Sequence, residues 1–207
     1  MKIFTLLTLV TLSLAIGLAA ACSTATNTGT TNQTKNAANT ANAPATNSAV
    51  APKKDEDAPA SVKAAFPDAQ SFTKQHKDIP KEQIALIEKE TNAKVPDTDH
   101  HSYLVFSTTG GARKQIGDAT VVEAGGKEFV IIYDNKEGRP FVKEVRGEGV
   151  PALFLAQFAG KNHDDKFQIG ADIKANGVDE KLAKAIAEAV RVDAMTMQTL
   201  YGAADKH

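Results

Sequence analysis

The sequence predicts an α+β fold, in which a small antiparallel sheet is flanked by helices and follows a signal peptide and a disordered tether. Three observations support this prediction. An apolar run ends on the only cysteine, a low-complexity polar stretch follows, and β-branched and aromatic runs then alternate with segments of helical periodicity. The expected boundaries are 1–21 for the signal peptide, 22–58 for the tether and 59–207 for one globular domain.

The N-terminal segment has the features of a secretory signal peptide. A short basic start precedes an uncharged run from Ile3 to Gly17, and small residues then lead to Cys22. This end resembles the lipobox of bacterial lipoproteins, in which the cysteine becomes the lipid-carrying N-terminus, although Ala19 stands where that family usually has leucine. A plain signal peptide or a transmembrane anchor is the alternative, but the run is short for a span of about 20 residues.

Lipidation at Cys22 would place the chain in the cell envelope, anchored to a membrane and facing the periplasm or the cell surface. Ser23 follows the cysteine, which by resemblance to enteric lipoproteins weakly favours the outer membrane. From there to about Ala51 the chain is almost entirely Thr, Asn, Ala and Ser. Such a composition cannot bury enough apolar surface to offset its ordering entropy, so we expect a disordered tether.

Composition and motifs exclude several function classes. The 24 basic and 25 acidic side chains give a formal net charge of −1, which does not favour binding to nucleic acid. One cysteine cannot form an internal disulfide. The chain also lacks the HExxH, CxxC, GxSxG and Walker phosphate-loop patterns, so nothing in it supports a hydrolase.

Two helices and two strands are expected in the first half of the domain. Pro80 suits the first turn of a helix, where its missing N–H is tolerated, and Ile84 and Ile87 give that helix an apolar stripe. The expected elements are a short helix over 60–66, a helix from Pro80 to about Thr91, and strands over 103–106 and 116–123, the second ended by Gly125-Gly126.

The second half predicts a hairpin followed by helices. Phe129–Tyr133 is β-branched and aromatic and is predicted to be a strand, with a turn over 134–138 and a partner strand over 141–146. A short apolar helix is expected over 151–158, with Gly160 as its C-cap. The last helix is the longest, with Asp179 as its N-cap and an apolar face made of Leu182, Ile186, Val190, Met197 and Tyr201.

Two groups of residues have metal-ligand character. His100 and His101 lie near Asp97 and Asp99, but adjacent side chains in extended chain point in opposite directions, and the flanking sequence is typical of a solvated loop. We therefore expect a loop and not a metal site there. The run from His163 to Asp165 follows a helix end and is expected at the surface.

A succession of motifs in the second half resembles the FMN-binding domain of extracytoplasmic electron-transfer proteins. The motifs are Gly125-Gly126-Lys127, Val145-Arg146-Gly147-Glu148-Gly149, Phe154-Leu155-Ala156-Gln157-Phe158-Ala159-Gly160-Lys161 and Gly170-Ala171-Asp172-Ile173 before the last helix. That family includes the flavin-carrying subunits of sodium-translocating quinone reductases and of ferredoxin-linked complexes, together with stand-alone lipoproteins. The resemblance covers roughly 66–192 and implies FMN as cofactor, electron transfer as function and a redox partner protein.

The resemblance also implies which residues would hold the flavin. The phosphate would lie at the start of the last helix, where free N–H groups and the helix dipole attract anions. Cations that converge there would balance its charge. The candidate cofactor-binding residues are Gly126, Lys127, Arg146, Lys161, Asp172, Gly177, Val178, Asp179 and Glu180.

The chain departs from the family where the flavin is attached. A threonine carries FMN through a phosphoester in family members, and a gap-free count from Asp172 places Glu180 at that position. Covalent attachment is therefore excluded, and Asp179 and Glu180 would repel a phosphate. Two unit charges about 4 Å apart cost on the order of 1 kcal/mol in water and several times more near a protein surface. Non-covalent FMN binding and a flavin-free binding or structural lipoprotein are the two functions that stay open.

Overall fold

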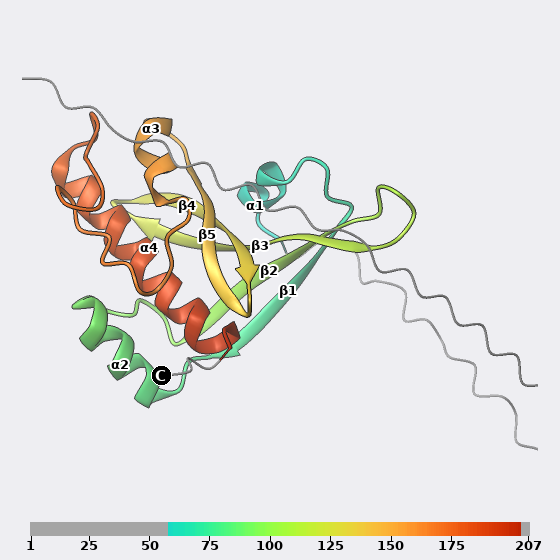
Figure 1. Cartoon of the computed structure of the whole chain (residues 1–207), viewed down its shortest axis with the longest axis horizontal. Helices are drawn as coiled ribbons and strands as arrows, with labels where there is room; N and C mark the ends of the chain where they lie inside the picture. The colour runs from blue at the N-terminus through green and yellow to red at the C-terminus, as the bar shows by residue number, and fades with distance from the viewer. Residues whose placement is uncertain (1–57, 204–207) are drawn as a thin grey trace, which may run out of the picture. The chain divides into compact units, whose positions relative to one another are not determined.

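The computed structural model describes residues 58–203, which form one sheet and its covering helices (Figure 1). The expected signal peptide, Cys22 and nearly all of the expected tether lie outside the described residues. Within residues 58–203, no helix combines the length and apolarity needed to cross a membrane. The elements are α1 (Ala60–Ala65), β1 (Ser71–Asp78), α2 (Lys81–Thr91), β2 (Asp99–Ser107), β3 (Lys114–Ala124), β4 (Lys127–Lys136), β5 (Arg139–Gly147), α3 (Ala152–Leu155), the 3-10 turn η1 (Ala156–Phe158) and α4 (Glu180–Tyr201).

The five strands form one antiparallel sheet in the order β1-β2-β3-β4-β5, which confirms the α+β class and the antiparallel sheet. The sequence did not predict β1. Its residues are Ser-Phe-Thr-Lys-Gln-His-Lys-Asp, and none of them is buried. A strand at the edge of a sheet that carries charged side chains has no apolar alternation to reveal it.

The two hairpins that join β3, β4 and β5 turn where glycines allow it. Gly125 and Gly126, with φ of +59° and +72°, join β3 to β4. Glu137 and Gly138, with φ of +56° and +82°, join β4 to β5. The expected turn over 134–138 is therefore too long, because β4 continues to Lys136 and pairs with β5 up to that residue.

Helices cover both faces of the sheet. Alternate residues of β4 point to opposite sides: Phe129 and Ile131 pack under α4, whereas Val130 and Ile132 pack under α1. The α4 side holds the larger core, which is built from Phe129, Ile131, Tyr133, Val142, Val145, Phe154, Phe158, Phe167, Ile173, Ile186, Val190 and Met197. Burial of the predicted apolar face of α4 is thereby confirmed for Ile186, Val190 and Met197.

The strands β2 and β3 separate along their length. Their ladder runs from Tyr103↔Ala119 to Ser107↔Lys114. The β1–β2 ladder continues beyond it to Asp78↔Asp99, and the β3–β4 ladder continues to Ala124↔Lys127. The start of β2 and the end of β3 thus each keep one partner strand and diverge from each other.

Candidate functional site

The first backbone N–H groups of α4 are bonded to the side chain of the helix's own N-cap residue. Asp179 Oδ1 accepts hydrogen bonds from the backbone N–H groups of Lys181 at 3.0 Å and Leu182 at 3.1 Å, as the predicted N-cap does. The carboxylate of Glu180 lies 2.7 Å from Lys184 Nζ. Amides that would bind a phosphate are therefore already bonded to a carboxylate, and a second negative charge stands beside them.

Each of the three candidate cations has a partner other than the start of α4. Lys127 Nζ donates to Glu148 O at 3.4 Å, and Lys161 Nζ lies 3.7 Å from Asp165 Oδ1. Arg146 donates to both carboxylate oxygens of Glu144, at 2.8 and 2.9 Å, and to Ala65 O of α1 at 2.9 Å. Because α1 and α4 cover opposite faces of the sheet, Arg146 lies on the wrong face to balance a charge at the start of α4.

Other motif residues have structural contacts that explain their presence. Gln157 pairs through its side-chain amide with the backbone of Lys174, accepting at 2.8 Å and donating at 2.8 Å. Asp172 Oδ2 accepts from Gln168 N at 3.1 Å. These bonds hold the loop before α4 against α3 and η1. They explain the presence of Gln157 and Asp172 without a bound flavin.

The glycine turn is the part of the motif set that does lie beside α4. A Cβ built on Gly125 would be 2.5 Å from Leu182 Cδ1, so the turn presses on the first turn of the helix. Gly126 has open space around its Cα, and Gly177, with φ of +85°, leads into Val178, whose N–H donates to Ala175 O at 2.9 Å. The residues at this end therefore approach one another, but two of the amides that a phosphate would need are already bonded to Asp179.

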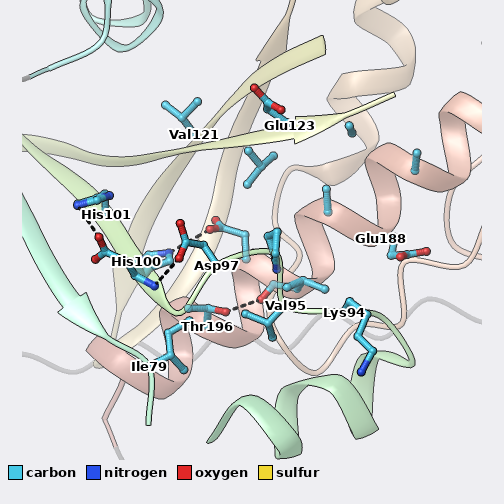
Figure 2. A pocket seen from close by; sticks show the side chains of 18 of the residues that line it. Ile79, Lys94, Val95, Asp97, His100, His101, Val121, Glu123, Glu188 and Thr196 are labelled. Atoms are coloured by element: carbon cyan, nitrogen blue, oxygen red, sulfur yellow. Dashed lines mark hydrogen bonds and ion pairs between the residues drawn. The ribbon is translucent and has the colours of Figure 1, made fainter. Parts of the chain in front are cut away.

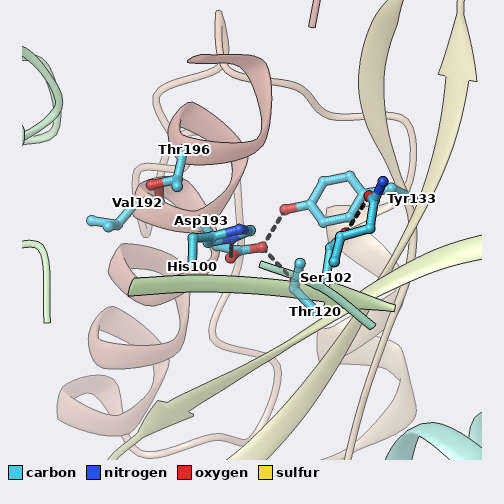
Figure 3. Close-up of polar contacts among 8 residues, drawn as sticks. His100, Ser102, Thr120, Tyr133, Val192, Asp193 and Thr196 are labelled. Atoms are coloured by element: carbon cyan, nitrogen blue, oxygen red, sulfur yellow. Dashed lines mark hydrogen bonds and ion pairs between the residues drawn. The ribbon is translucent and has the colours of Figure 1, made fainter. Parts of the chain in front are cut away.

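A buried polar cluster joins α4 to the sheet (Figure 3). The hydroxyls of Thr120 and Tyr133 each donate to Asp193 Oδ2 at 2.6 Å. His100 Nε2 lies 3.1 Å from Asp193 Oδ1, and because an ionised carboxylate only accepts, this nitrogen carries the hydrogen. Three strands thus contribute one donor each to a carboxylate that is 6% exposed.

Asp118 lies on the same face of β3, next to this cluster. Burial raises the pKa of Asp118 to about 6, and the negative charge of Asp193 adds to the effect, against a smaller lowering by the Ser102 hydroxyl. Burial also raises the pKa of the Tyr133 phenol, with Asp193 again contributing. Asp118 and Tyr133 line a hollow of about 570 Å³, which Gln75 and Tyr201 also line. This is the one place among the described residues where a carboxyl group with a raised pKa faces a cavity.

The expected solvated loop around His100 and His101 is wrong. Both residues lie in β2, and the His100 side chain is only 10% exposed because it reaches Asp193 across the sheet. No local pattern predicts this contact, because a histidine partnered by a carboxylate far away in the chain has no local signature. The His163 ring is likewise mostly buried, at 9% exposure, although its neighbour Asp164 is at the surface as expected.

A groove of about 760 Å³ opens where β2 and β3 diverge (Figure 2). The start of β2 and the end of β3 form two of its walls, α4 contributes Ala189 and Val192, and the loop before β2 closes it. Five carboxylates line this groove, from Asp97, Asp99, Glu123, Glu188 and Asp193, against one lysine, Lys94. Lys94 in turn pairs with Glu88 at 2.9 Å. The groove is therefore acidic and unsuited to an anion such as FMN.

Comparison of the chain with protein-family models, with curated proteins and with solved structures finds no match.

Proposed function

We propose that this protein is a lipid-anchored domain of the cell envelope that works without flavin, as a binding lipoprotein. The observation that carries this proposal is the bonding of Asp179 to the amides of Lys181 and Leu182, because FMN would need those amides for its phosphate. The anchor at Cys22 and the tether that follows it are part of the proposal and derive from the sequence alone.

The groove between β2 and β3 is the ligand site that this proposal favours. Its volume of about 760 Å³ falls within the usual range for small-molecule sites, roughly 300–1,000 Å³. Its excess of carboxylates selects cationic ligands. The motif residues that resemble the flavoprotein family would then be kept for folding, as the bonds of Gln157 to Lys174 illustrate.

Non-covalent FMN with electron transfer to a redox partner is the second candidate, and one observation favours it. The Gly125-Gly126-Lys127 turn lies against the first turn of α4 at Leu182, which is where the resemblance would put it. A flavin at that position would have to displace the Asp179 carboxylate from the helix amides.

Titration of FMN against the full chain, followed by quenching of flavin fluorescence, distinguishes the two candidates. The wild type is expected to bind FMN more weakly than a Kd of about 1 mM. The double variant Asp179→Ser with Glu180→Thr keeps a good N-cap while removing both charges, and it is expected to bind at least about tenfold more tightly than the wild type. Glu82→Gln removes an exposed first-turn carboxylate from α2 instead of α4 and serves as the matched control.

Two results would decide against the flavin-free proposal. One is a wild-type protein that is purified with the visible absorbance of a flavin. The other is wild-type binding as tight as that of the double variant, which would mean that the phosphate is held away from α4.

A further inference from the structure

Three side chains of β1 and β2 form a group of metal-ligand type that the sequence did not reveal. His76 lies directly opposite His101 in the antiparallel register, and Asp99 precedes His101 by two residues. Directly paired residues share a face of the sheet, and so do residues two apart on one strand. All three side chains therefore project from the same face, and their potential ligand atoms lie within 4.8 Å of one another.

The carboxylate of Asp99 lies between the two imidazoles. Its Oδ1 is in close contact with His76 Nε2, and its Oδ2 is 3.6 Å from His101 Nε2. The two ring centroids are 5.1 Å apart. A tetrahedral ion with bonds of about 2.0–2.1 Å holds its ligand atoms roughly 3.3 Å from one another. Side-chain rotations alone can close the remaining difference, because the backbone positions are already paired.

A fourth residue gives an independent reason to expect a cation. Asp78 lies directly opposite Asp99 in the register, and its Oδ1 is 3.5 Å from His76 Nε2. Like charges directly opposite each other destabilise an antiparallel pair. A dication held by Asp99 would relieve that repulsion, and Asp78 is exposed enough to become a further ligand.

We propose that His76, Asp99 and His101 bind a divalent transition-metal ion, with Zn²⁺ as the reference ion. Two imidazoles and one carboxylate form the ligand set of zinc sites that keep an open position, whereas Ca²⁺ and Mg²⁺ prefer oxygen ligands alone. The three side chains are 54%, 38% and 33% exposed, so an ion enters from solvent and retains water. Their positions on two paired strands hold them in place.

This site lies at the rim of the acidic groove, since Asp99 and His101 also line it. His101 projects at that edge in Figure 2, away from the buried His100. The proposal does not depend on whether FMN binds, because none of its ligands belongs to the start of α4.

Calorimetric titration of Zn²⁺ into the full chain tests the site, with a purification tag that contains no histidine. We expect one ion per chain. His76→Gln and His101→Gln should each weaken binding at least about tenfold, since even residues that only support metal ligands change affinity by 10–100-fold. His163→Gln removes a histidine outside the cluster and should leave affinity unchanged. A Cys22→Ser preparation that still binds shows that the thiol is not the ligand.

Melting temperatures separate loss of the site from loss of the fold. Without metal, the His76→Gln variant should melt near the wild type, because the residue lies exposed on the edge strand. Saturating Zn²⁺ should raise the melting temperature of the wild type and not that of His76→Gln or His101→Gln. A wild type that releases no heat with Zn²⁺ overturns the proposal, and so do variants that bind as well as it does. Both results leave the FMN titration unaffected.

Discussion

Tyr133 of β4 donates a hydrogen bond of 2.6 Å to Asp193 of α4, and this contact fixes the rotation of the helix above the sheet. Apolar packing alone would allow α4 to slide or turn by small steps, because side chains of similar size can replace one another. A buried carboxylate with three donors from three strands permits one arrangement, since any other leaves polar groups unpaired.

Replacement of Asp193 by alanine is expected to lower the free energy of unfolding by about 3 kcal/mol, because His100, Thr120 and Tyr133 each lose a buried acceptor. Urea denaturation measures this change. Asp193→Asn keeps the shape and should cost less. Glu188→Ala, on an exposed position of the same helix, should stay within about 0.5 kcal/mol of the wild type, and an equal loss in both alanine variants would contradict the role of the cluster.

The raised pKa of Asp118 predicts a specific dependence of stability on pH. The folded chain holds this proton up to about pH 6, whereas the unfolded chain loses it near 3.8. The folded state therefore binds more protons between those values, and the contribution of Asp118 to stability falls as pH rises from about 4 to 6. Asp118→Asn should thus raise the free energy of unfolding above that of the wild type by about 3 kcal/mol at pH 7, and this difference should shrink towards pH 4.

Denaturant melts of both chains across that pH range check this prediction. Asp68→Asn at an exposed position is the matched control and should follow the wild type at every pH. If the stability curves of Asp118→Asn and the wild type run parallel, the carboxyl group does not titrate as described.

Gly147→Ala is expected to destabilise the domain by roughly 1–3 kcal/mol through overpacking. Gly147 pairs with Phe129 across β4 and β5, and an added Cβ would lie well inside contact distance of the Phe129 ring. The smaller Phe129→Leu side chain should cost less in the Gly147→Ala background than in the wild type. A double-mutant cycle by thermal melting measures this coupling, and strict additivity would argue against the contact.

Lipidation at Cys22 predicts that the expressed protein enters the detergent-rich phase in a partitioning experiment. Cys22→Ala should move to the aqueous phase, because this cysteine is the only one in the chain. Identical aqueous partitioning of both proteins would rule out the lipid anchor.

Local sequence patterns predicted the elements that bury a regular apolar face. The strand at Phe129–Tyr133, the capped helix after Asp179 and the turn at Gly125-Gly126 each depend on neighbouring residues, and the structure has all three. The second glycine turn is present too, but it is shorter than the expected 134–138. The edge strand β1 escaped prediction because it buries no face. Without β1, the sequence could not bring His76 opposite His101.

The candidate sites were harder to predict for a related reason. Asp193 meets Tyr133 and His100 only through tertiary packing, and their separations of 60 and 93 residues carry no spacing rule. The resemblance to the flavoprotein family identified residues near the start of α4, but charges such as Arg146 are placed by the face of the sheet they occupy. Successive side chains along β5 point to opposite faces of the sheet, so a shift of one residue moves a side chain to the other face. A sequence motif does not show which face its residues occupy.

The short ladder between β2 and β3 also affects which part of the domain unfolds first. The stretch from 71 to 107 is continuous in the chain and pairs with the rest of the sheet at five positions, from Tyr103 to Ser107. It is also held to α4 by the packing of α2, by the His100–Asp193 contact and by the bonds of Arg191 to Glu90 and Thr91. A contiguous stretch with a short strand ladder to its neighbour is a typical unit of partial unfolding. Amide hydrogens in this stretch should therefore exchange with solvent before those of the β3–β5 meander, and its release would bring Asp193 into contact with water.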